Sequence, residues 1–173
     1  MTFFDLVKAR HSIRSYLPQA IHRDAVGCIL SAINLAPSAG NLQAYEVSVI
    51  EKPGIKSALA KAAFQQTFIE QAPVVLVFAA NPRQSAAKYG ERGETLYCIQ
   101  DATIAATYAQ LAATELGLGS CWVGAFDERA VAKAAGTPAH LRPVVILPLG
   151  LAAEQPQRPP RRPLVEFLRC DNT

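Results

Sequence analysis

The hydrophobic pattern predicts two helices in the first part of the chain. Thr2 and Asp5 have the form of a capping box, which predicts a short helix to about Ala9. From Asp24 onward, apolar residues recur every three to four positions until Pro37, which predicts a second helix. That helix leads into a polar loop that begins at Pro37.

Four segments have the pattern of β-strands. Residues 45–50 alternate between polar and apolar side chains, and residues 73–80 are apolar and rich in β-branched side chains. Two shorter candidates are residues 120–123 and 144–147. A strand that is apolar throughout is covered on both faces, so we expect residues 73–80 to lie in the centre of a sheet.

Three further helices are predicted, over residues 55–71, 96–116 and 127–136. The second has few polar positions, so we expect it to run through the middle of the fold or an interface, with Gly117 at its C-terminal cap. Residues 81–93 contain two glycines, one proline and several charges without periodicity. We interpret them as a mobile surface loop that could act as a lid.

The last twenty residues, 154–173, are predicted to form an extended arm. Residues 154–163 contain four prolines and three arginines, a composition that disfavours both helix and sheet. The apolar side chains that follow would be exposed to solvent unless the arm packs against another surface: Leu164, Val165, Phe167 and Leu168. We therefore expect the arm to dock, plausibly on a second subunit.

Composition favours a soluble chain with one domain, residues 1–173. The length of 173 residues is near the usual domain size, and 50% apolar with 18% charged residues excludes a disordered chain. The longest strictly apolar run, residues 74–80, is too short to span a bilayer. A net charge of +3 without a block of basic residues does not indicate nucleic-acid binding.

The cysteines and the N-terminus predict a cytoplasmic protein. Asp5 interrupts the apolar stretch that a signal peptide needs. The three histidines are scattered and no carboxylate cluster accompanies them, so we expect no metal site. The cysteines are too far apart for a CxxC pair, and we interpret them as buried thiols: Cys28, Cys98, Cys121 and Cys170.

The first candidate site is a cationic segment directly after the first helix. In an extended chain, Arg10, Ser12 and Arg14 lie on one side, so two guanidinium groups flank a hydroxyl. This arrangement suits a phosphate group. The alternative is a solvated cationic turn.

The second candidate is the polar loop at residues 37–43. Its short side chains allow close approach of a flat heteroaromatic ligand, and the amides of Asn41 and Gln43 both donate and accept hydrogen bonds. The alternative is an ordinary turn, because Pro, Ser, Gly and Asn are common turn residues.

The glycine-containing segment 116–124 suggests two readings that we reject. A dinucleotide fingerprint needs GxGxxG between a strand and a helix, whereas Trp122 occupies the third glycine position and the order here is helix, then strand. The surroundings of Cys121 are similar to a papain-type nucleophile, but His140 lies only 19 residues further on. A cysteine hydrolase is therefore the least favoured hypothesis.

Five motifs in this order and spacing resemble the nitroreductase family of flavoproteins. The resemblance covers nearly the whole chain and rests on Arg10-His11-Ser12-Ile13-Arg14, residues 37–43, Gln100-Asp101, residues 117–124 and Arg161. It implies an α+β fold with a central mixed or antiparallel sheet flanked by helices. It also implies a homodimer that exchanges the C-terminal arm and holds FMN at its interface, with NADH or NADPH as electron donor.

The resemblance also assigns residues to the cofactor. Arg10, Ser12, Arg14 and Arg161 would hold the phosphate and ribityl end of FMN, with His11 contributing through its backbone. Backbone amides of Gly124 and Ala125 would lie near the reactive edge of the flavin. Residues of the partner subunit's loop would face its ring system, with Gln43 as a further contact: Pro37, Ser38, Ala39 and Asn41.

The predicted activity is a ping-pong hydride transfer from NAD(P)H through FMN N5 to a small conjugated acceptor, such as a nitroaromatic or a quinone. No catalytic side chain is required, because the flavin performs the chemistry. The alternative is a flavin-binding carrier or redox-sensing module without turnover. Val123-Gly124-Ala125 leaves the cleft open and the acceptor unspecified.

Overall fold

A four-stranded antiparallel sheet forms the centre of the fold. The computed structural model describes residues 1–170. The strand order is β1-β2-β4-β3, and every pair in it is antiparallel. The strands are β1 (Tyr45–Ile50), β2 (Val74–Ala80), β3 (Gly119–Ser120) and β4 (Arg142–Gly150).

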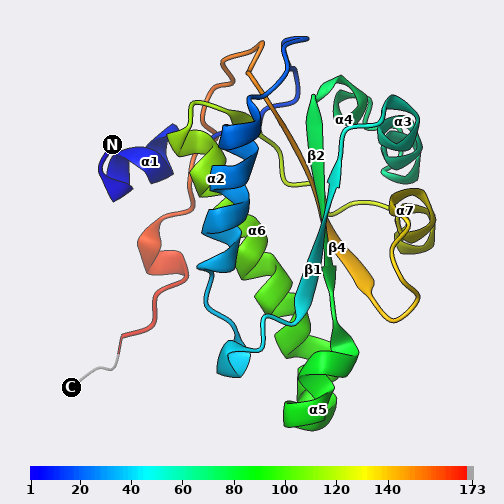
Figure 1. Ribbon diagram of the computed structural model, residues 1–173. Coiled ribbons are helices and arrows are strands. Elements are labelled where there is room, and N and C mark those ends of the chain that lie inside the picture. The colour runs from blue at the N-terminus through cyan, green and yellow to red at the C-terminus, as the bar shows by residue number, and fades with distance from the viewer. Residues whose placement is uncertain (171–173) are drawn as a thin grey trace.

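Helices cover both faces of this sheet (Figure 1). One face carries α2 (Arg23–Asn34) and α6 (Cys98–Glu115), and the other carries α3 (Pro53–Ala62) and α7 (Glu128–Ala135). The sheet therefore separates two apolar clusters, which is the layered α+β arrangement expected from the sequence.

Strand β2 confirms the prediction of a central strand. All seven of its residues are buried, and it pairs with β1 on one side and β4 on the other. Its side chains alternate between the two clusters, with Val75 and Val77 packing toward α3 and α7, and Leu76 and Phe78 toward α2 and α6. Burial on both faces explains why the strand has no polar position.

Helix α6 lies against the sheet through a stripe of small residues. Ala105, Ala106, Ala109 and Ala113 are fully buried, so the helix backbone can approach the strands closely. The helix ends as predicted at Gly117, whose φ of 73° closes a Schellman motif. The amide of Leu118 donates to Ala113 O at 2.8 Å, and the amide of Gly117 donates to Thr114 O at 3.0 Å.

The predicted mobile loop at residues 81–93 is wrong, because the structure forms helix α5 (Pro82–Arg92) there. The Asn81 side chain caps this helix by accepting a hydrogen bond from the amide of Gln84 at 3.1 Å. Gly90, with φ 58°, interrupts the helical backbone, so the hydrophobic pattern of α5 is not regular. A short π-helix, η2 (Gly93–Tyr97), then joins α5 to α6.

Two other predicted elements are shorter than expected. The helix over residues 55–71 is broken into α3 and α4 (Phe68–Gln71), because Phe64 and Gln65 adopt positive φ angles of 55° and 64°. The strand over residues 120–123 is reduced to β3, and Val123 adds one isolated bridge to Ile146.

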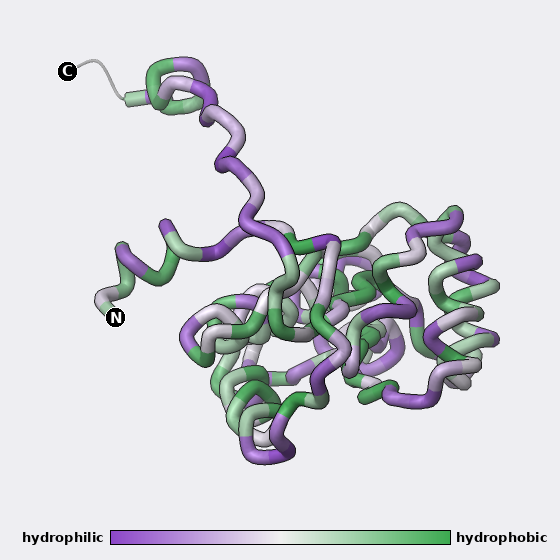
Figure 2. The backbone as a smooth tube through the Cα atoms, turned by 90° about the horizontal axis from the view of Figure 1, so that it is seen from above, coloured by the Kyte–Doolittle hydropathy of each residue, from purple (hydrophilic) through white to green (hydrophobic). Residues whose placement is uncertain are grey.

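The two ends of the chain lie apart from the sheet layers (Figure 2). Helix α1 (Phe3–Ala9) has no buried residue, and residues 154–163 form neither helix nor strand. The arm continues through a 3₁₀ turn, η3 (Leu164–Glu166), and its residues 171–173 lie outside the described part of the chain. All four apolar side chains of the arm are at least half exposed.

The cysteine prediction is half correct. Cys98 and Cys121 are buried, but Cys28 and Cys170 are exposed, because they lie on the outer face of α2 and on the arm. In residues 1–170, no helix is long and apolar enough to cross a membrane.

Candidate functional site

The cationic segment after α1 is held against the edge of the sheet at β3. Ser12 forms a parallel bridge with Ser120, and the amide of Ile13 donates to Ser120 O at 2.9 Å. Ile13 is buried below this edge, whereas Arg14 is exposed. The alternation places Arg10, Ser12 and Arg14 along one cavity, as the sequence predicts.

The C-terminal arm returns alongside this segment and completes the cavity. The amide of Ala153 donates to Ser15 O at 2.9 Å, and the amide of Arg14 donates to the Glu154 carboxylate. Further along, Arg158 Nη2 donates to the carbonyl oxygens of Val7 at 2.9 Å and Lys8 at 2.7 Å. These contacts fix the course of the arm over the end of α1.

Both ends of the chain therefore line one basic cavity of about 220 Å³. The lining includes Arg10, His11, Ser12 and Arg14 from the N-terminal segment and Arg161 from the arm, which the sequence had grouped together. Arg158 is an additional member that the sequence did not identify. We call the guanidinium groups of Arg10, Arg14, Arg158 and Arg161 the basic cluster.

The basic cluster carries positive charge without a paired acid. None of its guanidinium groups belongs to an ion pair within residues 1–170, whereas Arg162 pairs with Glu166. Burial lowers the pKa of Arg10, and the nearby charges of Arg161 and Arg158 lower it further. A bound dianion would relieve this repulsion, so the cluster fits a phosphate ester such as that of FMN.

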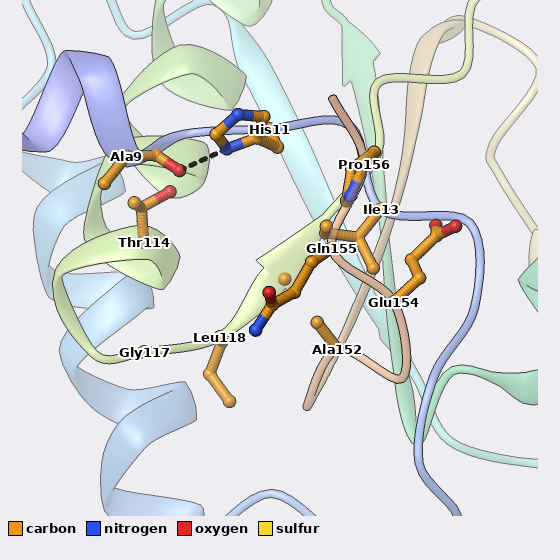
Figure 3. Close-up of a pocket in the computed structure, with 11 residues that line it drawn as sticks. Ala9, His11, Ile13, Thr114, Gly117, Leu118, Ala152, Glu154, Gln155 and Pro156 are labelled. Carbon is orange, nitrogen blue, oxygen red and sulfur yellow. Dashed lines mark hydrogen bonds between the residues drawn. The ribbon is translucent and has the colours of Figure 1, made fainter. Parts of the chain in front are cut away.

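A second cavity, of about 380 Å³, adjoins the basic one (Figure 3). His11 and Pro156 border both cavities. The His11 ring is turned toward α1, with Nδ1 at 2.7 Å from Ala9 O, as the dashed line in Figure 3 shows. Because a carbonyl only accepts, Nδ1 carries the proton in this hydrogen bond. The ring therefore orders the turn after α1, and His11 also lines the basic cavity.

Gly124 and Ala125 continue the sheet edge that begins at Ser120. Four residues of extended chain, at about 3.3 Å each, place Gly124 roughly 13 Å beyond Ser120. Both residues are exposed, and the Gln66 side chain donates to Ala125 O at 3.2 Å. Neither residue lines the basic cavity, and Gly124 lines a separate cavity of about 130 Å³ together with Glu128 and Arg142.

The polar loop at residues 37–43 lies at the opposite end of α6. Its turn, η1 (Ala39–Asn41), is fastened to Asp101 in the first turn of α6, whereas the second cavity includes Thr114 at the helix end. Asp101 and Thr114 are 13 positions apart on α6, so at about 1.5 Å per residue they are separated by roughly 20 Å.

One chain thus brings together only part of the predicted site. Arg10, His11, Ser12, Arg14 and Arg161 meet, with Gly124 and Ala125 on the same edge. The loop residues do not join them: Pro37, Ser38, Ala39, Asn41 and Gln43. This separation agrees with the expectation that the loop serves the site of a second subunit.

Comparison with known proteins identifies the family. The sequence model of the nitroreductase family matches residues 7–71 and 56–151. The chain belongs to the nitroreductase family. A nitroreductase relative from Thermus thermophilus, named NADH dehydrogenase, is 31% identical, and the match covers 90% of this chain and 89% of the relative.

Other members of the nitroreductase family agree in sequence and fold. The FMN reductase (NADPH) of Bacillus subtilis is 26% identical, and the match covers 88% of this chain and 66% of that protein. A solved nitroreductase family protein from Clostridium novyi NT is 30% identical, with a TM-score of 0.80 over 89% of this chain and 87% of that one. The nitroreductase fold predicted from the sequence is therefore confirmed.

Proposed function

We propose that this nitroreductase is an FMN-dependent NAD(P)H oxidoreductase that reduces a conjugated acceptor, such as a nitroaromatic or a quinone. The basic cluster carries the proposal, because four arginines line one cavity and none of them belongs to an ion pair within residues 1–170, although Arg158 also donates to Val7 O and Lys8 O. Relatives named NADH dehydrogenase and FMN reductase (NADPH) support the choice of cofactor and electron donor.

The chemistry that FMN supplies when bound is acceptance of a hydride from NAD(P)H and, after the oxidised nucleotide leaves, two-electron reduction of the acceptor in the same cleft. The protein's part is to bind and orient. The basic cluster holds the phosphate, and the Ser12 hydroxyl donates to it. The backbone amides of Gly124 and Ala125 would be the donors for the reactive edge of the ring, where fixed donors stabilise developing negative charge.

The active form is proposed to be a homodimer in which each loop at residues 37–43 faces the flavin of the other subunit. Two unpartnered apolar surfaces support this assembly: Phe3 and Phe4 of α1 are 64% and 72% exposed, and Val165 of the arm is 84% exposed. We also propose that residues 1–173 form one domain, with residues 154–173 as an arm that docks on the partner.

A spectroscopic titration tests the proposed activity. The purified protein is expected to bind FMN, and anaerobic NADH or NADPH should bleach the flavin absorbance, which an acceptor then restores. Parallel lines in double-reciprocal plots would support the ping-pong order, and intersecting lines would contradict it. A yellow protein that neither nucleotide bleaches would be a flavin carrier, and a protein that takes up no FMN would refute the flavin site.

Deletion of the arm tests the assembly. A chain that ends at Ala153 is expected to sediment as a monomer or as a weaker dimer and to lose FMN, because it lacks Arg158, Arg161 and the apolar arm residues. A truncated chain that stays dimeric and retains its flavin would contradict the proposed role of the arm.

A further inference from the structure

Asp101 is a buried acid whose carboxylate holds the polar loop. Its side chain comes from the first turn of α6 and the residue is only 2% exposed. Carboxylate Oδ1 accepts a hydrogen bond from the amide of Ala39 at 2.9 Å. Oδ2 is buried and has no hydrogen-bond partner within residues 1–170.

The loop that Asp101 contacts has an unusual backbone. Gly40, Asn41 and Gln43 have φ angles of 57°, 57° and 50°, and such left-handed conformations are costly for residues other than glycine. Glycine tolerates this conformation, but Asn41 and Gln43 also adopt it within three positions, and local preference alone does not hold that shape. External contacts must therefore stabilise the turn.

Several contacts are local to the loop: the amides of Asn41 and Leu42 donate to Ser38 O and Ala39 O, and Gln43 Nε2 donates to Asn41 O and Oδ1. The amide of Gln43 donates to Ser38 Oγ at 2.9 Å within the loop, and Gln84 Nε2 of α5 donates to Leu42 O at 2.6 Å. These two hydrogen bonds hold the backbone at the end of the loop, at Gln43 and Leu42. At the start of the turn, Asp101 is the side chain that accepts an amide hydrogen bond, and a carboxylate is a stronger acceptor than a neutral group.

The energetic balance of Asp101 does not favour it as a purely structural residue. A buried polar atom without a partner destabilises the folded state, and a carboxylate does so more than a neutral group. An apolar side chain in the first turn of α6 would avoid that cost. What the acid contributes in return is a fixed position for Ala39.

We propose that Asp101 is a positioning residue that sets the shape of the loop at residues 37–43 for contact with the flavin of the partner subunit. The proposal rests on the proposed function for the identity of the ligand and for the homodimer that brings the loop to it. Asp101 acts through the loop. It lies in the first turn of α6 and does not line the cavity of the basic cluster. Its loss should therefore alter how the ring is held without removing a phosphate contact.

The first measurement uses the protein without FMN. Amide exchange of Ala39, Asn41 and Leu42, whose amides donate hydrogen bonds in the turn, is measured by NMR in the wild type, Asp101→Ala and Asp101→Asn. We expect exchange at least about ten-fold faster in Asp101→Ala, with partial recovery in Asp101→Asn, whose side-chain oxygen can still accept the hydrogen bond. Thr107→Ala, at an exposed position further along α6, is the matched control and should exchange as the wild type does.

The second measurement is of FMN binding and of the absorption spectrum of the bound flavin. Asp101→Ala is expected to raise the Kd for FMN at least about ten-fold and to shift the spectrum, with Asp101→Asn in between. Unchanged exchange in Asp101→Ala, or unchanged Kd and spectrum despite faster exchange, would overturn the proposal. If Asp101→Ala does not fold, Asp101→Asn is judged by the same criteria. Absence of FMN binding in the wild type would instead refute the proposed function, and the exchange measurement would still judge the contact.

Discussion

The backbone amide of Arg14 donates a hydrogen bond to the carboxylate of Glu154, 140 residues later in the chain. This contact joins the N-terminal segment to the first residue of the arm. It also places the carboxylate of Glu154, which lines the second cavity, beside Arg14, which lines the basic cavity. Glu154 therefore has two opposing effects, since it fastens the arm and reduces the positive potential at the basic cluster.

Two substitutions at Glu154 separate these effects. Glu154→Gln keeps a hydrogen-bond acceptor and removes the charge, so we expect FMN affinity equal to or higher than that of the wild type. Glu154→Ala removes the acceptor as well, which should lower the free energy of unfolding by about 1 kcal/mol and weaken FMN binding. Fluorescence titration with FMN and urea unfolding would measure both effects. Weaker binding in Glu154→Gln than in Glu154→Ala would contradict this explanation.

Arg158 is expected to contribute to FMN binding although the sequence did not single it out. Arg158→Ala and Arg161→Ala each remove one charged group from the basic cluster, so each should raise the Kd for FMN roughly 10- to 150-fold. Arg162→Ala is the matched control, because the Arg162 guanidinium pairs with Glu166 at 3.8 Å within the arm. Equal losses in all three variants would show that net charge, and not position, holds the anion.

The thiols should differ in reactivity according to burial. Burial raises the pKa of Cys121, and the nearby Arg14 and Arg10 offset only part of this rise, so the thiolate is disfavoured at neutral pH. In the native protein we expect Cys28 to react with a thiol reagent while Cys98 and Cys121 react only after unfolding. Cys121→Ala should leave flavin reduction unchanged. Loss of all activity in that variant would revive the cysteine hydrolase.

The pair of Glu128 and Arg142 should make stability depend on pH in the acidic range. Hydrogen bonds from Arg142, at 2.8 and 3.0 Å, hold the pKa of Glu128 below its ordinary value. A carboxyl whose pKa is lowered on folding stabilises the protein above its unfolded pKa of about 4.3, and that contribution is lost as the pH falls through the folded value.

Urea unfolding of the wild type and Glu128→Gln at neutral and acidic pH would measure this contribution. Because both side chains are about half exposed, we expect a difference of roughly 0.3–1 kcal/mol at about pH 7 that shrinks toward about pH 3. A difference that stays constant across this range would show that the ion pair does not contribute.

The sequence predicted the elements best where burial imposes a regular pattern. Strand β2 and helix α6 were found because β2 is apolar throughout and α6 nearly so, and Gly117 marks the end of α6. Helix α5 was missed because it is polar and interrupted at Gly90. A usable signal was present: Asn81 as N-cap, followed by proline in the first turn.

The candidate site was predictable only in part, for a different reason. Arg10, Ser12 and Arg14 share one side of an extended segment, which local geometry alone predicts. Arg158 and Arg162 are both arginines among prolines, and nothing local distinguishes the one that donates to Val7 and Lys8 from the one that pairs within the arm. That distinction depends on the course of the arm, which contacts distant in sequence determine.

The separation of the basic cluster from the polar loop by the length of α6 has a genetic consequence. In a mixed dimer, one chain could carry Arg14→Ala and the other Asp101→Ala. Both defects would then fall on the same cleft, and the other cleft would keep intact arginines and an intact loop. If the proposed dimer forms, two alleles that each weaken FMN binding should together give up to half of the flavin sites in each mixed pair the wild-type affinity, whereas either allele alone gives none.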